Sequence, residues 1–550
     1  MLVPEESAAS PPDGAPQYIR SEATRLLCAG VYFDSRFRRR VIEQLVEHEE
    51  RPVAPSLGID VLPVLAHALR ARRREAETGL VLLAVWAGFI ACWLAGIWSQ
   101  TLLPVPWFLA YGLVCAVCWG VRGGRGAVFA LGRSVLKEAT RGRLKAVLPV
   151  LPFAVTFAYW ALVLFTLFSG GSAWAAVLFP VLLVPPVWAH RAHVSSVMRH
   201  QLSRGAPARR EELPVSDQYQ RIGAAIDREQ HAHLAIYDPF RPFVGAGEPY
   251  KPWSFVMELK RRTPQKQLGG VPGPGADTGA LTGREVIDLI KPRLEALRTS
   301  AAASSRDRLR SLEVDEMVYL PVGVARGEVR YDPANVRRHL DGAVGEGGEA
   351  RRHFLRVRVG AWDEQVGVSL LVRVHTQGGM LVLEVVPHIL TPVRPEFRSV
   401  DVIAAQRADD VLRDAVRCLL TSPAAGFAAA VSLLRTAVSL FRTWLTLPQY
   451  ALPDGPVTSV RELGSVHEVS LLQEMDISRY VKTLQDRIAG GVREALRAKG
   501  YESGEFEQYV VNVNGGGVFI GEMSGGAVAT GERASAKQQD ITVKSGGGRS

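Results

Sequence analysis

The stretch RARRREAETGLVLLAVWAGFIACWLAGIW, residues Arg70–Trp98, decides the fold class of this chain. Four arginines and two glutamates come first, and the run from Gly79 onward carries no charged side chain. A bilayer core about 30 Å thick is crossed by roughly 20 apolar helical residues. The stretch therefore predicts a transmembrane helix over 79–98 with a strongly basic flank.

Three more charge-free runs follow, which predict further transmembrane helices over 102–120, 146–168 and 173–189. The last run is short, and we expect its prolines to kink it, although membrane helices tolerate proline better than soluble ones. No run contains an ionisable side chain of Asp, Glu, Lys, Arg or His, which argues against a pump or an ion-coupled transporter. The sequence thus predicts a four-helix transmembrane block over 79–189, arranged as two hairpins.

The basic residues fix the predicted orientation. They precede the first run, separate the second from the third and follow the fourth, whereas the links SQT (99–101) and SGGS (169–172) carry no charge. Basic loops stay on the cytoplasmic side. We therefore predict a multi-pass protein of a bacterial inner membrane with both termini in the cytoplasm; the Arg, Ala, Gly and Val bias fits a high-GC bacterium.

The composition agrees with a membrane block joined to a larger soluble region. The chain has 550 residues, a net charge of +10 and a mean hydropathy of only +0.07. Arginines beside the apolar runs explain much of the charge, and the lack of basic patches interleaved with aromatics argues against nucleic acid. The five cysteines form no disulfide framework, and the pair Cys115 and Cys118 lacks the second pair that a zinc site needs.

The predicted soluble fold is a cytoplasmic α+β domain over 205–420 with an antiparallel sheet. Three strands with short links, 353–362, 365–376 and 380–390, predict an antiparallel meander. The remaining segments are predicted as follows: 1–16 disordered, 17–78 a cytoplasmic helical segment, 462–500 helical, 506–536 a Gly-rich β-like tail and 537–550 disordered.

His231 and His233 are the only candidate metal ligands that the pattern offers. They form an HxH on a predicted strand, where residues i and i+2 share a face. The nearby acids show no ligand spacing, so a histidine pair on the surface or bonded within the fold is the favoured interpretation. We expect no bound metal or cofactor.

The segment 424–447 predicts an amphipathic helix whose polar side carries only cations, Arg435 and Arg442. It could lie in the inner-leaflet surface with its apolar face in the acyl boundary and both arginines at the phosphates of anionic lipids. It could equally cover the sheet. Its predicted closeness to the membrane favours the first interpretation.

The tail 510–536 is not a phosphate cradle, because no Gly-Lys-Ser/Thr follows its glycines and Ile520 replaces the third glycine of GxGxxG. Its alternating Val, Ile and Ala residues indicate short strands, which could bind an unknown protein partner by β-augmentation.

The run GGGVFIGEMSGGAVATGERASA resembles Gly-rich β tails at the ends of some bacterial conflict-system proteins. The stretches CAGVYFDSRFRRRVIEQLVEH, PFVGAGEPYKPWSFVMEL and GAWDEQVGVSLLVRVHTQGGMLVLEVVPHILTPV resemble uncharacterised multi-pass membrane proteins of actinobacteria. The resemblance covers most of the chain and implies no site residue.

Three function classes follow from these observations. The first is a membrane-anchored cytoplasmic module for binding, sensing or scaffolding. The second, suggested by the tail, is a membrane-perturbing effector of a bacterial defence system. The third is a membrane-anchored enzyme with its site in 205–420; no spacing of Asp, Glu, His or Ser predicts such a site, so the sequence leans against an enzyme.

Overall fold

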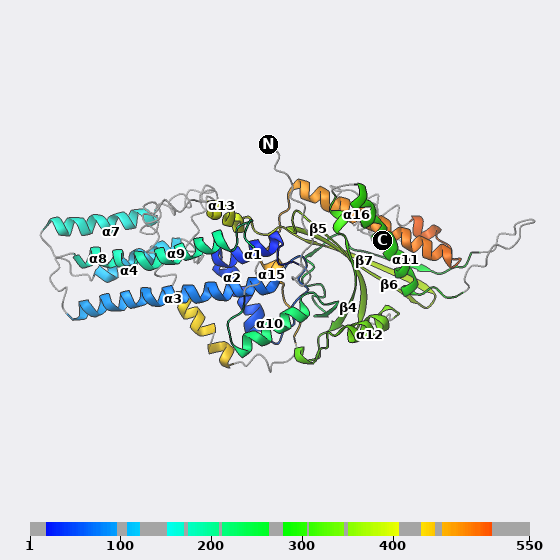
Figure 1. Cartoon of the computed structure of the whole chain (residues 1–550), viewed down its shortest axis with the longest axis horizontal. Coiled ribbons are helices and arrows are strands. Elements are labelled where there is room, and N and C mark those ends of the chain that lie inside the picture. The colour runs from blue at the N-terminus through cyan, green and yellow to red at the C-terminus, as the bar shows by residue number, and fades with distance from the viewer. Residues whose placement is uncertain are drawn as a thin grey trace, which may run out of the picture.

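The structure is a computed structural model of the chain, and Figure 1 shows an elongated molecule. A bundle of long helices forms one end, a curled sheet forms the other, and short helices lie between them. The segments predicted to be disordered, 1–16 and 537–550, lie outside the described residues. The structure describes residues 18–95, 107–121, 151–169, 174–207, 212–262, 279–304, 307–345, 350–405, 431–439, 441–445 and 454–508.

Each of the four apolar runs contributes to the helical bundle. By length and composition, two of the described helices could cross a membrane, Val61–Cys92 and Ala176–His200, whereas Trp107–Gly120 and Ala154–Phe168 are shorter. The described parts of all four runs are thus helical, and a crossing of the membrane by all four stays a prediction. The helices are α3 (Val61–Leu94), α4 (Trp107–Val121), α7 (Leu151–Phe168), α8 (Trp174–Leu182) and α9 (Val184–His200).

The fourth run is interrupted where its prolines predict a kink. Helix α8 ends at Leu182 and α9 begins at Val184. Pro185 and Pro186 stand in the first turn of α9, where a missing backbone N–H removes no intrahelical bond. Helix α3 shows no such break: its 34 residues, about 50 Å at 1.5 Å each, join the basic flank and the apolar run in one helix.

Short helices pack around the ends of α3 and α9 that lie nearest the sheet. Their shared core contains Leu26, Leu65, Val197 and Phe397, which come from four distant parts of the sequence. Gly30 permits the close approach of Phe397, because a Cβ there would lie 2.5 Å from its ring. These elements are α1 (Glu22–Phe33), α2 (Ser35–Ile42), η1 (Glu43–Glu47), α10 (Asp217–Glu229), η4 (Pro395–Arg398), α13 (Ser399–Ala405) and α15 (Val460–Leu463).

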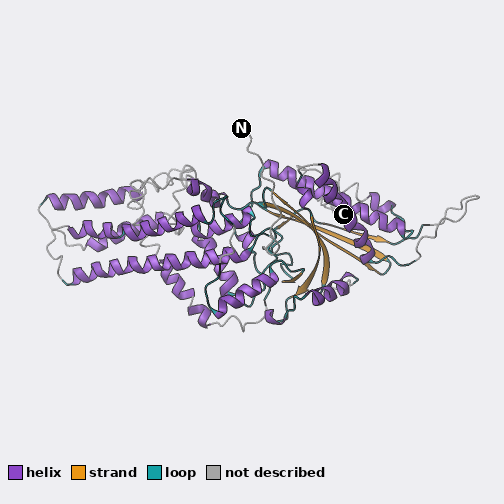
Figure 2. Ribbon diagram, in the orientation of Figure 1, coloured by secondary structure: helices purple, strands orange, loops and turns teal. Residues whose placement is uncertain are grey.

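Seven strands form one curled sheet in the order β1-β4-β5-β6-β7-β2, with β3 also paired to β7 (Figure 2). The meander β5–β6–β7 is antiparallel, as the short links predict. The strands are β1 (Leu234–Tyr237), β2 (Glu248–Pro249), β3 (Trp253–Glu258), β4 (Glu313–Pro321), β5 (Arg352–Ala361), β6 (Val366–Gln377) and β7 (Met380–Leu390).

The predicted antiparallel sheet is in fact mixed, because β1 pairs with β4 in parallel, with Leu234 opposite Val318. Strands β2 and β3 and helix α11 (Gly283–Ser304) separate β1 from β4 in the sequence. The chain therefore returns along a crossover, which short links between neighbouring strands cannot reveal. Helix α12 (Pro333–Val344) connects β4 to β5 and contacts both.

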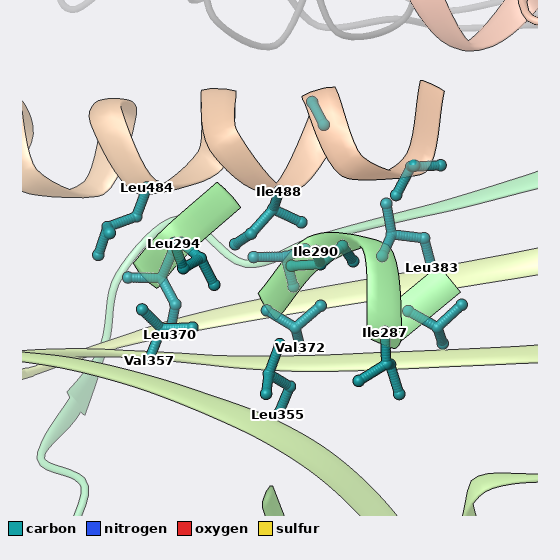
Figure 3. Close-up of a cluster of buried hydrophobic side chains, with 14 of the residues drawn as sticks. Ile287, Ile290, Leu294, Leu355, Val357, Leu370, Val372, Leu383, Leu484 and Ile488 are labelled. Atoms are coloured by element: carbon teal, nitrogen blue, oxygen red, sulfur yellow. The ribbon is translucent and has the colours of Figure 1, made fainter. Parts of the chain in front are cut away.

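One face of the sheet is apolar and is covered by α11 and α16 (Leu471–Ala498). Figure 3 shows Ile290 of α11 and Ile488 of α16 meeting Val372 and its neighbours on the strands. Gly491 lets the helices approach, since a Cβ there would lie 2.7 Å from Ile290 Cγ1. Helix α16, predicted within 462–500, therefore belongs to the same core as the sheet.

The predicted β-like tail begins differently from the expectation. Residues 504–508 are helical, and Phe506 is fully buried with its ring 5.2 Å from that of Phe255 on β3. Phe506 completes the core at the edge of the sheet, and this packing accounts for the helical turn. The rest of the tail, from 509 onward, lies outside the described residues.

Candidate functional site

A helix with one apolar face lies beside α3 and away from the sheet (Figure 1). Residues 431–439 and 441–445 are helical, and we call them the surface helix. No described residue covers this apolar face, and a contiguous exposed apolar surface marks an interaction site. These residues are the described part of the segment 424–447 that is predicted to be an amphipathic helix, and the rest of the segment lies outside the described residues. More than half of each of these side chains is exposed: Leu434, Val438, Phe441, Trp444 and Leu445.

The polar side of the surface helix holds it to the protein. Glu47 of η1 accepts hydrogen bonds from the Ser439 hydroxyl and from Nη2 of Arg442, the latter at 3.1 Å. The polar face therefore docks inward and the apolar face points outward. This is the reverse of a helix that covers a sheet.

The two predicted membrane-surface residues, Arg435 and Arg442, have different surroundings. Arg442 forms the ion pair with Glu47, whereas Arg435 is exposed and forms no ion pair with any described residue. Arg435 also lines a pocket between the surface helix, α2, α3 and α4. Residues lining this pocket are Ser35, Arg38, Arg39, Ile42, Glu47, Arg72, Glu75, Trp119, Val431, Ser432, Arg435, Thr436 and Ser439.

His231 and His233 lie in the turn before β1 and not on a strand as predicted. The His231 ring packs on Tyr18 with the centroids 5.4 Å apart, and burial lowers the pKa of His231. His233 Nδ1 lies 3.2 Å from the carbonyl oxygen of Glu316. Within the described residues, neither histidine belongs to a group of three or more side chains that could hold a metal ion.

The second face of the sheet carries a buried ion network centred on Arg358 of β5, which is 1% exposed. Its Nη1 donates to Glu313 of β4 at 2.9 Å, and its Nη2 donates to Glu364. The Tyr18 ring centroid lies 5.5 Å from the guanidinium carbon. Burial favours the neutral form of Arg358, but Glu364 and Glu313 outweigh this and raise its pKa. The network ties the N-terminal segment to the sheet.

An unusual turn holds Glu364 in this network. Three consecutive residues between β5 and β6, Trp362, Asp363 and Glu364, have φ of 53°, 54° and 65°. Side chains other than glycine adopt this region at a cost, so surrounding contacts must maintain it. Gly58 approaches from the other side, where φ is +73° and a Cβ would lie 2.4 Å from Arg358 Nη2.

Acidic side chains on β4 are likewise paired. Glu316 accepts from His353 Nε2 at 3.0 Å, Arg284 at 2.7 Å and Lys291 at 2.8 Å, and these partners, His353 first, lower its pKa despite burial. Asp315, also on β4, pairs with Arg356 at 2.9 Å. These carboxylates are engaged in charge neutralisation.

Sequence reasoning missed the Arg358 network, although one part of it was visible. Arg356 and Arg358 alternate with apolar residues in β5, which predicts that both face the side of the sheet away from α11. Strand alternation assigns a face to each residue and gives no information about burial. The burial follows from Tyr18, Gly58 and the β5–β6 turn, which are distant in sequence.

Comparison with known proteins identifies one related family. The model of the AbeC-like domain matches residues 252–527, half of the chain. The match begins at β3 and includes α11, the β4–β7 strands and α16, together with the surface helix. No curated protein and no solved structure matches the chain.

Proposed function

The chain belongs to the AbeC-like domain family, which is linked to abortive infection systems, and we propose that it is the membrane-anchored component of such a system. In this proposal four helices cross the inner membrane of a bacterial cell as a multi-pass anchor. Both termini and the AbeC-like domain lie in the cytoplasm. The domain acts there as a binding, sensing or scaffolding module.

The outer surface of the helical bundle supports the proposal most strongly. In the two helices long enough to cross, only 17% and 28% of the most apolar 18 residues are buried. Core helices of a soluble protein would be mostly buried. A soluble monomer rarely exposes apolar patches larger than a few hundred Å². Lipid is the solvent that such a surface fits. Large exposed side chains include Leu94, Leu113, Phe157, Phe165 and Phe168.

The inside of the bundle supports an anchor and not a channel. Aromatic rings fill it: Phe89 stacks on Phe179 at 4.2 Å, and Tyr111 meets Phe179 edge-on at 5.7 Å. The Tyr159 hydroxyl donates to the Ala176 carbonyl at 2.8 Å and links α7 to α8. Small residues, rings and interhelical hydrogen bonds are the contacts that associate helices in lipid.

The surface helix extends this apolar surface toward the domain. It meets α3 at Arg72 and Glu75, a few residues before the apolar run begins at Gly79. An amphipathic helix at that level places its apolar face in the acyl boundary and Arg435 near the phosphates. We therefore propose that lipid covers the exposed face of the surface helix.

Reporter fusions test the topology. Alkaline phosphatase, active only outside the cytoplasm, should be active when fused after Ser99 or Ser172 and inactive after Gly205. A green fluorescent protein fused at the same sites should give the opposite pattern. Fluorescence at Ser99 or Ser172, or recovery of the chain in the supernatant after ultracentrifugation without detergent, would contradict the proposal.

A membrane-perturbing effector is the second candidate, and the family's link to abortive infection favours it. Because one bundle is filled with aromatic rings, a pore on this view requires several chains to assemble. Induced expression should then release potassium and admit a membrane-impermeant dye. Induction of a chain ending at Leu202, which keeps the helices of the bundle, would separate an intrinsic effect of the bundle from one that needs the domain.

We further propose that the tail 510–536 offers strands to an unidentified protein partner. Co-purification from native membranes in mild detergent, followed by mass spectrometry, compares the full chain with a chain that lacks 510–550. A partner that binds the tail should be lost only in the deletion. Equal recovery from both chains would contradict this role of the tail.

A further inference from the structure

We propose that the pocket under the surface helix binds the phosphate of an anionic phospholipid headgroup, such as that of phosphatidylglycerol. This inference rests on the proposed membrane location and adds a specific lipid site to it. Four guanidinium groups line the pocket, Arg38, Arg39, Arg72 and Arg435, against two carboxylates, Glu47 and Glu75. The four arginines come from α2, α3 and the surface helix, so the complete pocket forms only when the surface helix is docked against α2 and α3.

The two carboxylates of the pocket already have cationic partners. Glu75 pairs with the buried Arg38, whose Nη1 also donates to the Val31 carbonyl at 2.9 Å. Glu47 pairs with Arg442, which does not line the pocket. Neither acid is therefore available to neutralise the remaining arginines.

Three arginines of the pocket lack a carboxylate partner among the described residues. Arg39 and Arg435 are exposed and form no ion pair there, and Arg72 donates only to the neutral Tyr219 hydroxyl at 3.3 Å. Like charges gathered around one pocket repel one another, and an anion between them removes that repulsion. A phosphodiester suits guanidinium groups because its oxygens accept parallel N–H bonds.

Hydroxyl groups complete the donor set. The side chains of Thr436 and Ser439 are engaged with the Ser432 carbonyl and with Glu47. The hydroxyls of Ser35 and Ser432 line the pocket and have no partner among the described residues. They can therefore donate to phosphate oxygens beside the guanidinium groups.

The position of the pocket favours a lipid over a free anion. Trp119, near the end of α4, lines it, and tryptophan prefers the membrane–water interface. The exposed side chains Leu434 and Val438 belong to the same helix as Arg435 of the pocket. A headgroup in the pocket can thus leave its acyl chains along apolar protein surface. Basic pockets between membrane helices on the cytoplasmic side bind anionic headgroups in this way.

Native mass spectrometry of the full chain in an uncharged detergent tests the assignment. The probes are phosphatidylglycerol, phosphatidylcholine and inorganic phosphate, each titrated separately. The variant R39Q/R435Q removes two exposed arginines of the pocket. Its control, R40Q/R330Q, removes the neighbouring exposed arginine of α2 and one beside α12, neither of which lines the pocket.

Phosphatidylglycerol should bind more tightly than phosphatidylcholine. R39Q/R435Q should weaken phosphatidylglycerol binding by about fivefold per arginine, roughly 25-fold in all, while the control changes it little. Equal binding of both lipids, or equal weakening in variant and control, would overturn the assignment. Binding of inorganic phosphate as tight as that of phosphatidylglycerol would identify a soluble-anion site and would also overturn it.

Membrane retention separates this inference from the proposed function. R39Q/R435Q keeps all four apolar runs and should stay in the membrane fraction. If the unaltered chain sediments with membranes but does not prefer phosphatidylglycerol, only the pocket assignment fails. If the unaltered chain is soluble without detergent, the proposed function fails as well.

Discussion

The helical bundle and the sheet distribute apolar and polar side chains in opposite ways. In the sheet, apolar residues such as Leu355 and Val372 are fully buried beneath α11 and α16. In the bundle, Phe157 is 76% exposed, and the buried positions include rings such as Tyr111 and small residues such as Ala176. The hydrophobicity of the side chains alone would place both regions in a protein core. The exposure of those side chains distinguishes the two regions, because large apolar surfaces rarely remain exposed unless the surrounding solvent is apolar.

The two regions also differ in whether they bury charged side chains. No charged side chain of the described residues belongs to the bundle core, whereas the sheet buries Arg358 at 1% exposure. The sheet can do so because Glu313 and Glu364 bind that cation directly. Packing and backbone hydrogen bonds therefore hold the bundle, while a specific ion network also holds the sheet to the N-terminal segment.

Removal of the partners of Arg358 should give the largest effect. In E313Q/E364Q the guanidinium stays buried without its anions, which we expect to lower the free energy of unfolding by about 3–5 kcal/mol. Hydrogen exchange of β5 and β6 amides in the full chain in detergent measures this loss. Glu77→Gln, which breaks exposed pairs with Arg73 and Arg74, should cost about 1 kcal/mol or less. Equal losses in the two variants would show that burial of Arg358 is immaterial.

A charge on the outer surface of each region compares their solvents directly. Phe157→Lys places a cation near the middle of the third apolar run and should disfavour insertion by about 2.5–3.5 kcal/mol. Val256 is 50% exposed on the edge strand β3, so Val256→Lys should change stability by less than about 0.5 kcal/mol. The fraction of chain in carbonate-washed membranes reports the first variant, and hydrogen exchange of β7 reports the second. A tolerated Phe157→Lys would contradict lipid exposure of α7.

Acid should weaken the sheet domain. Burial lowers the pKa of His388 from 6.5 to about 4, although its Nδ1 lies 3.2 Å from the Val386 carbonyl. Between these values the unfolded chain binds the proton that the folded chain excludes, so stability is full above pH 6.5 and falls toward pH 4. We expect a loss of about 2 kcal/mol at pH 5 relative to pH 7, measured by hydrogen exchange of β7 amides. His388→Phe should reduce that loss, and an unchanged pH dependence would assign it to other groups.

A single interhelical hydrogen bond should give the smallest effect. Tyr159→Phe removes the bond to the Ala176 carbonyl and leaves the ring in place. Such bonds contribute on average about 0.6 kcal/mol in membrane bundles, with a maximum near 1.7. Thermal unfolding in detergent should therefore shift only slightly, whereas Tyr159→Ala should shift it much more. A large effect of Tyr159→Phe would mean that polar contacts dominate the bundle.

The sequence predicted what depends on local pattern. Charge-free runs gave the helices of the bundle, proline gave the break at Leu183, and short links gave the β5–β6–β7 meander. Contacts between distant segments could not be predicted in this way. The parallel pairing of β1 with β4 and the meeting of Tyr18 with Arg358 each join segments about 80 or more residues apart.

The candidate site was predicted only in part. The periodicity of apolar residues predicted the surface helix and placed Arg435 on its polar face. It could not decide whether the apolar face packs on the sheet or on the membrane. The choice depends on Glu47, which draws the polar face inward. Arg39 and Ser35 gave no signal, because they belong to another helix and reach the pocket only through the fold.

Spin labels at positions 157 and 256, in a chain whose native cysteines are replaced, compare two exposed apolar positions in one reconstituted sample. If lipid surrounds the bundle and water surrounds the sheet, the label at 157 should collide more often with oxygen than with a water-soluble nickel complex. The label at 256 should show the reverse. Nickel accessibility at 157 equal to that at 256 would place the bundle in water and contradict a membrane anchor.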